Sequence, residues 1–228
     1  MNGWQGPQLD AGPQSFWEKL HRNLTATARP PNPRLVEIAE SLSPGVALDL
    51  GCGGGGDAIW LAGRGWRVTA VDISGTAVAR VEAKAGELGL GDQVTGERHD
   101  LAHSFPTGTF DLVNAQYFHT PFALDRGRVL ASAARALRPG GLLLVVDHGS
   151  KAPWSWNQDP DAHYPTPDEV ATGLDLEPGQ WQVLRADMPQ RLATGPGGQR
   201  ATVTDNLLLI QRREDPAASR PDGGDLSA

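Results

Sequence analysis

Short apolar runs alternate with longer amphipathic stretches over the first two thirds of the chain. The apolar runs have the length and composition of buried strands, and we predict strands at Val46–Leu50, Arg67–Asp72, Gln93–His99, Phe110–Gln116 and Leu142–Asp147. The stretches with a 3.6-residue period predict helices at Ser15–Leu24, Asn32–Leu42, Asp57–Arg64, Ser74–Leu88 and Asp125–Leu137. Strands that alternate with helices in this way indicate an α/β protein with a parallel sheet covered on both faces.

The last third of the chain follows a different pattern. Two strand-like runs, Trp181–Leu192 and Ala201–Arg212, flank a turn of glycines and proline at Thr194–Gln199. This arrangement predicts an antiparallel hairpin that completes the sheet. Residues 1–14 and 214–228 lack apolar periodicity, so we expect flexible ends around a single domain at residues 15–213.

The composition is that of a globular protein, with 39% hydrophobic and 21% charged residues. The sequence contains no apolar run long enough to cross a membrane and no signal-peptide pattern at Met1–Ser15. The single cysteine excludes an internal disulfide and fits a cytoplasmic location. The net charge of −7 makes nucleic acid a weak candidate partner.

The first predicted strand leads directly into a loop that contains five glycines and the cysteine, Gly51–Gly56. In open α/β sheets, ligands bind beyond the carboxyl ends of the strands. The acidic residue Asp72 ends the second predicted strand, where a carboxylate can accept hydrogen bonds from both hydroxyls of a ribose. The loop therefore predicts a nucleotide-like ligand.

Two classes of cofactor fit a glycine loop combined with an acidic residue at the end of the second strand. The spacing Gly51-x-Gly53-x-x-Gly56 matches the dinucleotide fingerprint, which holds a pyrophosphate. However, Asp49 precedes the loop and Asp57 follows it, and two carboxylates would repel a pyrophosphate. They would instead favour a cofactor that carries an ammonium and a sulfonium. Asp100, after the third strand, is placed to accept from an adenine amino group.

Four segments, taken in order, resemble the class I S-adenosylmethionine-dependent methyltransferases. They are VALDLGCGGGGDAIWLAGRGWRVTAVDIS from Val46, HDL from His99, FDLVNAQYFH from Phe110 and LRPGGLLLVVDH from Leu137. The resemblance spans about residues 32 to 148, and the terminal hairpin also matches. It implies a three-layer, Rossmann-like fold with a mostly parallel seven-stranded sheet, a C-terminal antiparallel hairpin, and S-adenosyl-L-methionine as the cofactor.

The resemblance also implies a set of cofactor-binding residues. These are Asp49, Gly51 and Gly53 for the methionine moiety, Asp72 for the ribose, Ile73 for the adenine face, Asp100 and Leu101 for the adenine edge, and Gln116 near the sulfonium. Arg22 or Arg34 is expected to hold the methionine carboxylate, and the sequence does not choose between them. Cys52 is expected to fill space rather than to react.

Aromatic and histidine side chains are concentrated after the fourth and fifth predicted strands. We expect an acceptor pocket from Trp17, Tyr117, Trp154, Trp156 and His163. His148 is the first candidate for a general base and His119 the second, because the pKa of histidine lies near neutrality. No trio of acids suggests a metal site.

These observations predict a methyltransferase acting on a small-molecule acceptor. The attacking atom is either oxygen or nitrogen, as in natural-product tailoring, or sulfur or a metalloid, as in detoxification. Motifs for methylating adenine N6 or cytosine C5 in DNA are absent from the sequence. Two other readings stay open, namely a nicotinamide-dependent oxidoreductase and a non-catalytic module that binds S-adenosylmethionine.

Overall fold

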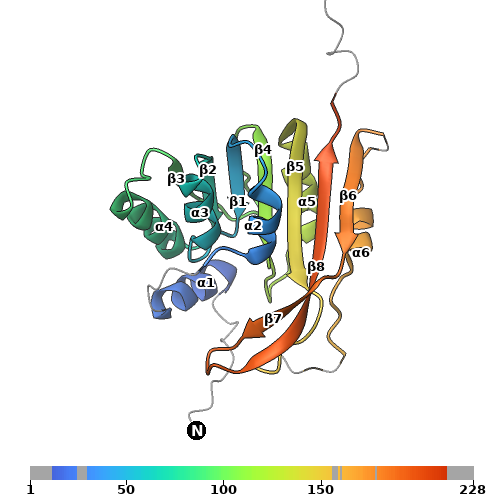
Figure 1. Ribbon diagram of the computed structural model, residues 1–228. Coiled ribbons are helices and arrows are strands. Elements are labelled where there is room, and N and C mark those ends of the chain that lie inside the picture. The colour runs from blue at the N-terminus through green and yellow to red at the C-terminus, as the bar shows by residue number, and fades with distance from the viewer. Residues whose placement is uncertain (1–11, 25–29, 156–158, 160, 178, 215–228) are drawn as a thin grey trace, which may run out of the picture.

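The structure, a computed structural model, describes residues 12–24, 30–155, 159, 161–177 and 179–214. A single twisted sheet runs through it in the order β3-β2-β1-β4-β5-β8-β6, with β7 paired to β8 (Figure 1). The strands are β1 Val46–Leu50, β2 Arg67–Asp72, β3 Val94–Arg98, β4 Phe110–Gln116, β5 Leu137–His148, β6 Trp181–Asp187, β7 Gln190–Thr194 and β8 Arg200–Arg212. Strands β1 to β5 are parallel, whereas β8 is antiparallel to β5, β6 and β7.

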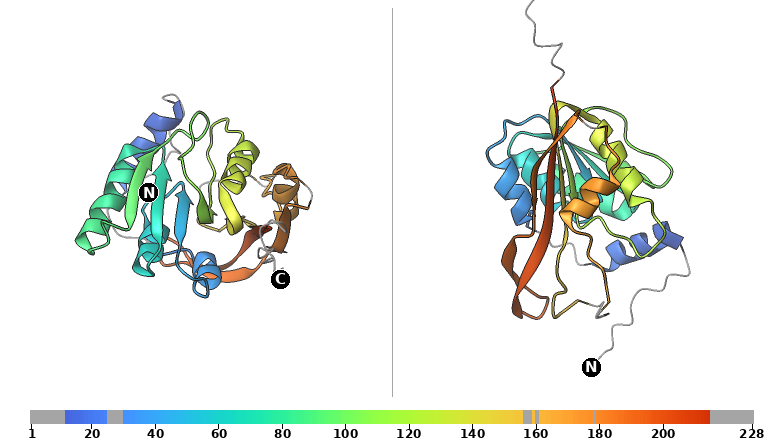
Figure 2. Two further views of the ribbon diagram at one scale, coloured as in Figure 1. Left: turned by 90° about the horizontal axis from the view of Figure 1, so that it is seen from above. Right: turned by 90° about the vertical axis from the view of Figure 1, so that its right-hand side faces the viewer.

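Helices cover both faces of the sheet, as the alternating pattern predicts (Figure 2). The helices are α1 Gly12–Asn23, α2 Pro33–Ala39, α3 Gly56–Gly63, α4 Gly75–Glu87, α5 Arg126–Arg135 and α6 Pro167–Gly173. Helices α2, α3 and α4 pack on one face, and α5 and α6 pack on the other. Helix α1 lies at the end of the sheet where the parallel strands finish, and the β7–β8 hairpin extends toward the same end (Figure 1).

The strands owe their burial to apolar side chains that alternate between the two faces. In β1, Ala47 packs toward α2 and α3, whereas Leu48 packs toward α5. In β4, Leu112 likewise packs toward α2 and α3, and Val113 packs toward α5. The polar residues Asp49 and Asn114 come next on the α3 side. They are register partners in the parallel β1–β4 pair, so the alternation places two buried polar groups side by side at the end of the sheet.

Local capping explains several helix boundaries. Ser74 caps α4 by accepting a hydrogen bond from the Ala77 amide at 3.2 Å, as expected for this residue type. Helix α6 was not predicted from its apolar pattern. Its signal is a capping box, in which Thr166 and Glu169 satisfy each other's backbone amides.

The C-terminal strands correct one prediction. The run predicted as one strand, Trp181–Leu192, is divided between β6 and β7, and the sheet has eight strands rather than seven. The break falls at Met188 and Pro189, and the lack of an N–H on proline prevents a continuous ladder there. The turn at Thr194–Gln199 is confirmed, and the Gly195 amide donates to the Gln199 carbonyl at 2.7 Å.

Several helix and strand boundaries also differ from the predictions. Helix α1 begins at Gly12, inside the segment expected to be flexible, and residues 1–11 and 215–228 of the expected flexible ends lie outside the described residues. Helix α5 ends at Arg135, two residues before the predicted end, and β5 begins at Leu137 rather than at Leu142. Gly140, at φ +82°, lets the strand bend near the register shift between β4 and β5.

Candidate active site

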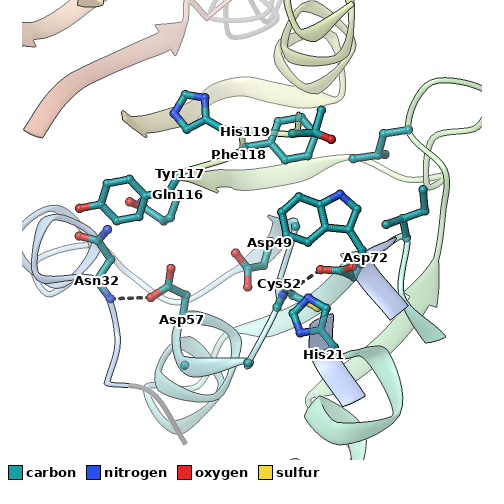
Figure 3. A pocket seen from close by; sticks show the side chains of 18 of the residues that line it. His21, Asn32, Asp49, Cys52, Asp57, Asp72, Gln116, Tyr117, Phe118 and His119 are labelled. Atoms are coloured by element: carbon teal, nitrogen blue, oxygen red, sulfur yellow. Dashed lines mark hydrogen bonds between the residues drawn. The ribbon is translucent and has the colours of Figure 1, made fainter. Parts of the chain in front are cut away.

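A cavity of about 730 Å³ opens beyond the carboxyl ends of β1, β2 and β4. The glycine loop after β1 forms its floor, the segment after β4 forms the opposite wall, and α1 contributes Trp17 and His21 (Figure 3). Its volume lies within the range of small-molecule sites, about 300–1,000 Å³. The cavity also lies at the edge of the sheet where the sequence predicts a ligand site.

The glycine loop has a left-handed backbone at alternate residues. Gly51, Gly53 and Gly55 have φ values of 69°, 48° and 76°, which side-chain-bearing residues rarely adopt. Gly55 is also the N-cap of α3, and a Cβ there would lie 2.5 Å from Val81 Cγ2. These requirements explain three of the five glycines. Gly54 and Gly56 lack positive φ values but line the cavity.

A buried and a half-buried carboxyl group, those of Asp49 and Asp57, meet beneath this loop. Asn114 Nδ2 donates to Asp49 Oδ1 at 2.8 Å and to Asp57 Oδ2 at 3.2 Å, and the Asn32 amide donates to Asp57 Oδ1 at 2.6 Å. Asp49 is only 3% exposed, and its Oδ2 atom is buried without a hydrogen-bond partner. Since buried acceptors are normally satisfied, this oxygen marks the place of a donor from a ligand.

The electrostatics of the pair favour a cationic donor. Burial, aided by the charge of Asp57, raises the pKa of Asp49 to about 8. Burial also raises the pKa of Asp57, although hydrogen bonds from Asn32 and Asn114 counteract the shift. A ligand ammonium between these groups would stabilise both carboxylates. The residues present therefore fit the amino end of a methionine moiety.

All the predicted cofactor-binding residues line this one cavity: Asp49, Gly51, Gly53, Asp72, Ile73, Asp100, Leu101 and Gln116. Asp72 is fixed by the amides of Gly53 at 3.0 Å and Ser74 at 2.9 Å. Asp100 accepts from the Ala102 amide at 3.1 Å and contacts His103 Nδ1 at 3.0 Å.

The second base candidate, His119, lines the cavity and has a buried carboxylate partner. Its Nε2 atom lies 3.1 Å from Asp147 Oδ1. Asp147 is 1% exposed, and Arg126 Nη2 holds its two oxygens at 2.7 and 2.6 Å. If the Nε2–H of a neutral His119 points at this carboxylate, Nδ1 is left as the acceptor.

The first base candidate, His148, does not line the cavity. Its ring stacks on Tyr117 with centroids 4.3 Å apart and lies 6.0 Å from the ring of His119. Burial, together with the nearby His119, lowers the pKa of His148. The alternation along β5 explains its place, because His148 and Asp147 lie on opposite faces of the sheet.

Only some of the residues predicted to bind the acceptor line the cavity. Trp17 and Tyr117 line the cavity, whereas Trp154 and His163 do not. Trp154 packs on the hairpin turn, where a Cβ on Gly195 would lie 2.5 Å from its ring. His163 is exposed and lies 3.3 Å from Glu169. Trp156 lies outside the described residues.

Helix α1 is attached to the body by its polar and aromatic side chains. The Glu18 carboxylate accepts from the hydroxyls of Ser74 and Thr76, at 2.7 and 2.5 Å, and from the Thr76 amide at 3.2 Å. These bonds at the start of α4 lower the pKa of Glu18 to about 2, with the Thr76 hydroxyl as the largest cause. On the other side, Phe16 meets Phe122 edge-to-face, with centroids 5.2 Å apart. Helix α1 thus covers the cavity from α4 to the segment after β4.

We expect Glu18→Gln to loosen this cover. The substitution removes the negative charge at the N-terminus of α4 and weakens the bonds to Ser74 and Thr76, each worth about 1 kcal/mol or more. Hydrogen exchange in α1 should become faster by roughly fivefold or more, while exchange in β1 and β4 stays unchanged. The matched control is Glu40→Gln, whose carboxylate pairs, within the described part of the chain, with the exposed Arg64. Equal exchange in α1 of both variants would contradict this attachment.

Three functional candidates were missed by sequence reasoning. Asn114 joins the two carboxyl groups, and its signal is a polar residue in an otherwise apolar strand beside Asp49. Arg191 and Thr194, from β7, also line the cavity. No local motif marks them, because only the fold of the hairpin brings them to this wall. By contrast, Arg22 and Arg34 do not line the cavity, and Arg34 Nε instead donates to Asp205 at 3.2 Å.

Comparison with known proteins agrees with this geometry. Residues 48–145 match a family described as a methyltransferase domain. A stretch of 146 residues is 34% identical to 27-O-demethylrifamycin SV methyltransferase of Amycolatopsis mediterranei, covering 59% of this chain and 53% of that protein. A stretch of 127 residues is 32% identical to ribosomal RNA small subunit methyltransferase C of Alcanivorax borkumensis, covering 53% of this chain and 37% of that protein. The aligned regions thus span about half the length, or less, of these two relatives.

The fold is shared more widely. A structure titled "Conversion of a Disulfide Bond into a Thioacetal Group during Echinomycin Biosynthesis" aligns with a TM-score of 0.65 at 24% identity, covering 90% of this chain and 95% of that one. TehB from Haemophilus influenzae aligns with a TM-score of 0.58 at 17% identity, covering 88% and 67%. Among the described residues, no helix is long and apolar enough to cross a membrane. The sequence motifs, the family match and the arrangement of the cavity agree in describing residues 48–145 as a methyltransferase domain of the class I, S-adenosylmethionine-dependent type.

Proposed function

We propose that this protein transfers a methyl group from S-adenosylmethionine to an oxygen or nitrogen atom of a small-molecule acceptor. The observation that carries the proposal is the unpartnered Asp49 oxygen beside Asp57, in a cavity that also holds Asp72 and a second wall with a histidine–carboxylate pair. The acidic pair also distinguishes this proposal from a nicotinamide-dependent oxidoreductase, since a pyrophosphate would be repelled there.

When bound, the cofactor supplies a methyl carbon activated by a positively charged sulfur. The protein's part is to hold both reactants and to keep water out. Asp49 and Asp57 would bind the ammonium, Asp72 the ribose hydroxyls and Asp100 the adenine amino group. The loop amides already fix Asp72, which keeps its carboxylate oriented before the ligand arrives.

On the acceptor side, we assign His119 as the general base. Its Nδ1 atom takes the proton from an acceptor hydroxyl or amine, and Asp147 stabilises the imidazolium that results. Arg126 Nη2 lies 2.6 Å from Asp147 Oδ2, so its positive charge compensates the buried carboxylate. Such a base favours oxygen or nitrogen acceptors, because a thiolate or metalloid needs none.

A small molecule suits the shape of the site. The cover by α1, with Trp17 over the cavity, encloses the space in which an acceptor would lie. Relatives named for rifamycin and nocamycin methylation act on small molecules, and another is named for sarcosine and dimethylglycine. The ribosomal RNA methyltransferase is a relative with a different acceptor, so RNA is the alternative to be tested.

The decisive experiment has a binding step and a transfer step. We expect S-adenosylhomocysteine, titrated by calorimetry, to bind with a micromolar Kd, and NADH not to bind. Release of S-adenosylhomocysteine is then followed with a panel of phenols, hydroxylated polyketides, amines, thiols and ribosomal RNA. Turnover with a phenol, alcohol or amine supports the proposal. Binding of NADH alone, or turnover with RNA only, would refute it.

A further inference from the structure

The hairpin brings an arginine to the cavity with a fixed orientation and an unused donor. Arg191 Nε donates to Asp205 Oδ2 at 2.8 Å, and Arg191 Nη2 donates to the Tyr117 hydroxyl at 2.9 Å. Its Nη1 atom has no hydrogen-bond partner among the described residues. Because the guanidinium is planar, the two bonds on one edge fix the direction of the remaining donors.

The partners of Arg191 are themselves held rigidly. Asp205 is completely buried, and it accepts from Tyr117 Oη at 2.9 Å as well as from Arg34 Nε at 3.2 Å. Two guanidinium groups thus share one buried carboxylate, and Arg34 makes a second ion pair with Glu37 at 2.9 Å. The group that faces the cavity is Arg191, so its positive charge is the one offered to a ligand.

The charge pattern of this end of the cavity is complementary to a zwitterion. Figure 3 shows Tyr117 lying over the same end as Asn32 and Asp57. Asp49 and Asp57 are suited to an ammonium, and Arg191, which is bonded to Tyr117, is suited to a carboxylate. An α-amino acid head group carries these two charges on neighbouring atoms.

We propose that Arg191 is a carboxylate-binding residue of this site, and that with the acidic pair it recognises the α-amino acid head group when the carboxylate is the cofactor's. The carboxylate belongs either to the methionine moiety of the cofactor or to the acceptor. The inference deepens the proposed function and rests on it for the identity of the cofactor. If the carboxylate is that of the methionine moiety, Arg191 takes the role that the family resemblance led us to expect for Arg22 or Arg34.

The test compares Arg191→Gln with wild type and with Arg185→Gln. Arg185 is a matched control, since it lies on β6, pairs with Glu37 and Asp187, and does not line the cavity. Calorimetry measures the binding of S-adenosylhomocysteine and of 5′-methylthioadenosine, which lacks the amino-acid head. A second titration adds benzoate, and its neutral analogue benzamide, to protein saturated with S-adenosylhomocysteine.

If the cofactor supplies the carboxylate, Arg191→Gln weakens S-adenosylhomocysteine roughly 10- to 100-fold and leaves 5′-methylthioadenosine unchanged. If the acceptor supplies it, both nucleosides bind as in wild type, and the preference for benzoate over benzamide is lost. Either result supports the proposal. Unchanged binding of all four compounds would overturn it, as would equal weakening of both nucleosides, which would indicate loosened packing.

Two further measurements keep these outcomes separate from misfolding and from failure of the proposed function. Arg191→Lys keeps a positive charge near Asp205 and replaces Arg191→Gln in the test if that variant is unstable. It should show the same selectivity among the compounds, with a smaller loss of affinity. If wild type binds no S-adenosylhomocysteine, the proposed function fails on its own. The benzoate and benzamide comparison on the unliganded protein then still decides whether Arg191 binds a carboxylate.

Discussion

Asp49→Asn is expected to weaken binding of S-adenosylhomocysteine by about 2 to 5 kcal/mol, roughly 30- to 4,000-fold. The substitution keeps the shape and the bond to Asn114 but removes the buried charge that an ammonium requires. Calorimetry provides the measurement. Binding of 5′-methylthioadenosine should stay near the wild-type value, because that compound has no ammonium. An equal loss for both ligands would contradict this role.

The pKa of Asp49 adds a pH signature to this expected result. Since the carboxyl group of the unliganded protein titrates at about pH 8, an ammonium that binds at pH 7 displaces a proton. The measured binding enthalpy should therefore depend on the ionisation enthalpy of the buffer, and affinity should rise with pH up to about 8. Both effects should disappear in Asp49→Asn.

Folding stability gives an independent check of the same group. The pKa in the folded state is raised above the unfolded value of about 3.9. The stability contributed by the protonated form is therefore fully present below about pH 4 and is lost as the pH rises through 8. Urea unfolding of the unliganded protein should show lower stability at pH 9 than at pH 6. Asp49→Asn should reduce this dependence.

The second large effect is expected at His119. Removal of a general base typically costs about 10²- to 10⁴-fold in rate, so His119→Ala should lower kcat by this amount with an oxygen or nitrogen acceptor. The Kd for S-adenosylhomocysteine should change little, because the proposed cofactor contacts lie on other residues. Steady-state kinetics with an acceptor from the panel, combined with calorimetry, measures both quantities.

Two variants distinguish a base from a merely structural histidine. Asp147→Asn should also lower kcat and alter the pH profile, since an amide no longer fixes the Nε2 proton. His148→Ala should have the smaller effect, because its ring stacks on Tyr117 and does not line the cavity. A larger loss in His148→Ala than in His119→Ala would restore His148 as the base.

Local patterns in the sequence predicted the order of the elements and the residues that line the cavity around the glycine loop. Strands β1, β2 and β4 have the predicted bounds, because a buried parallel strand is specified by a short, local apolar run. The predicted cofactor-binding residues all line one cavity for a related reason: they follow those strands directly, and the carboxyl ends of parallel strands meet at one edge.

The contacts of the opposite wall of the cavity depend on how distant segments pack in the fold. Register pairs Asn114 with Asp49, the faces of β5 separate Asp147 from His148, and the hairpin brings Arg191 to Tyr117 across 74 positions of the chain. These contacts join distant segments through side-chain direction and strand pairing, and neither leaves a local pattern in the sequence. The acidic pair could therefore be predicted from the glycine loop, and His119 was already a candidate base from the sequence. Its proximity to Asp147, and the place of Arg191 at the cavity, depended on the fold.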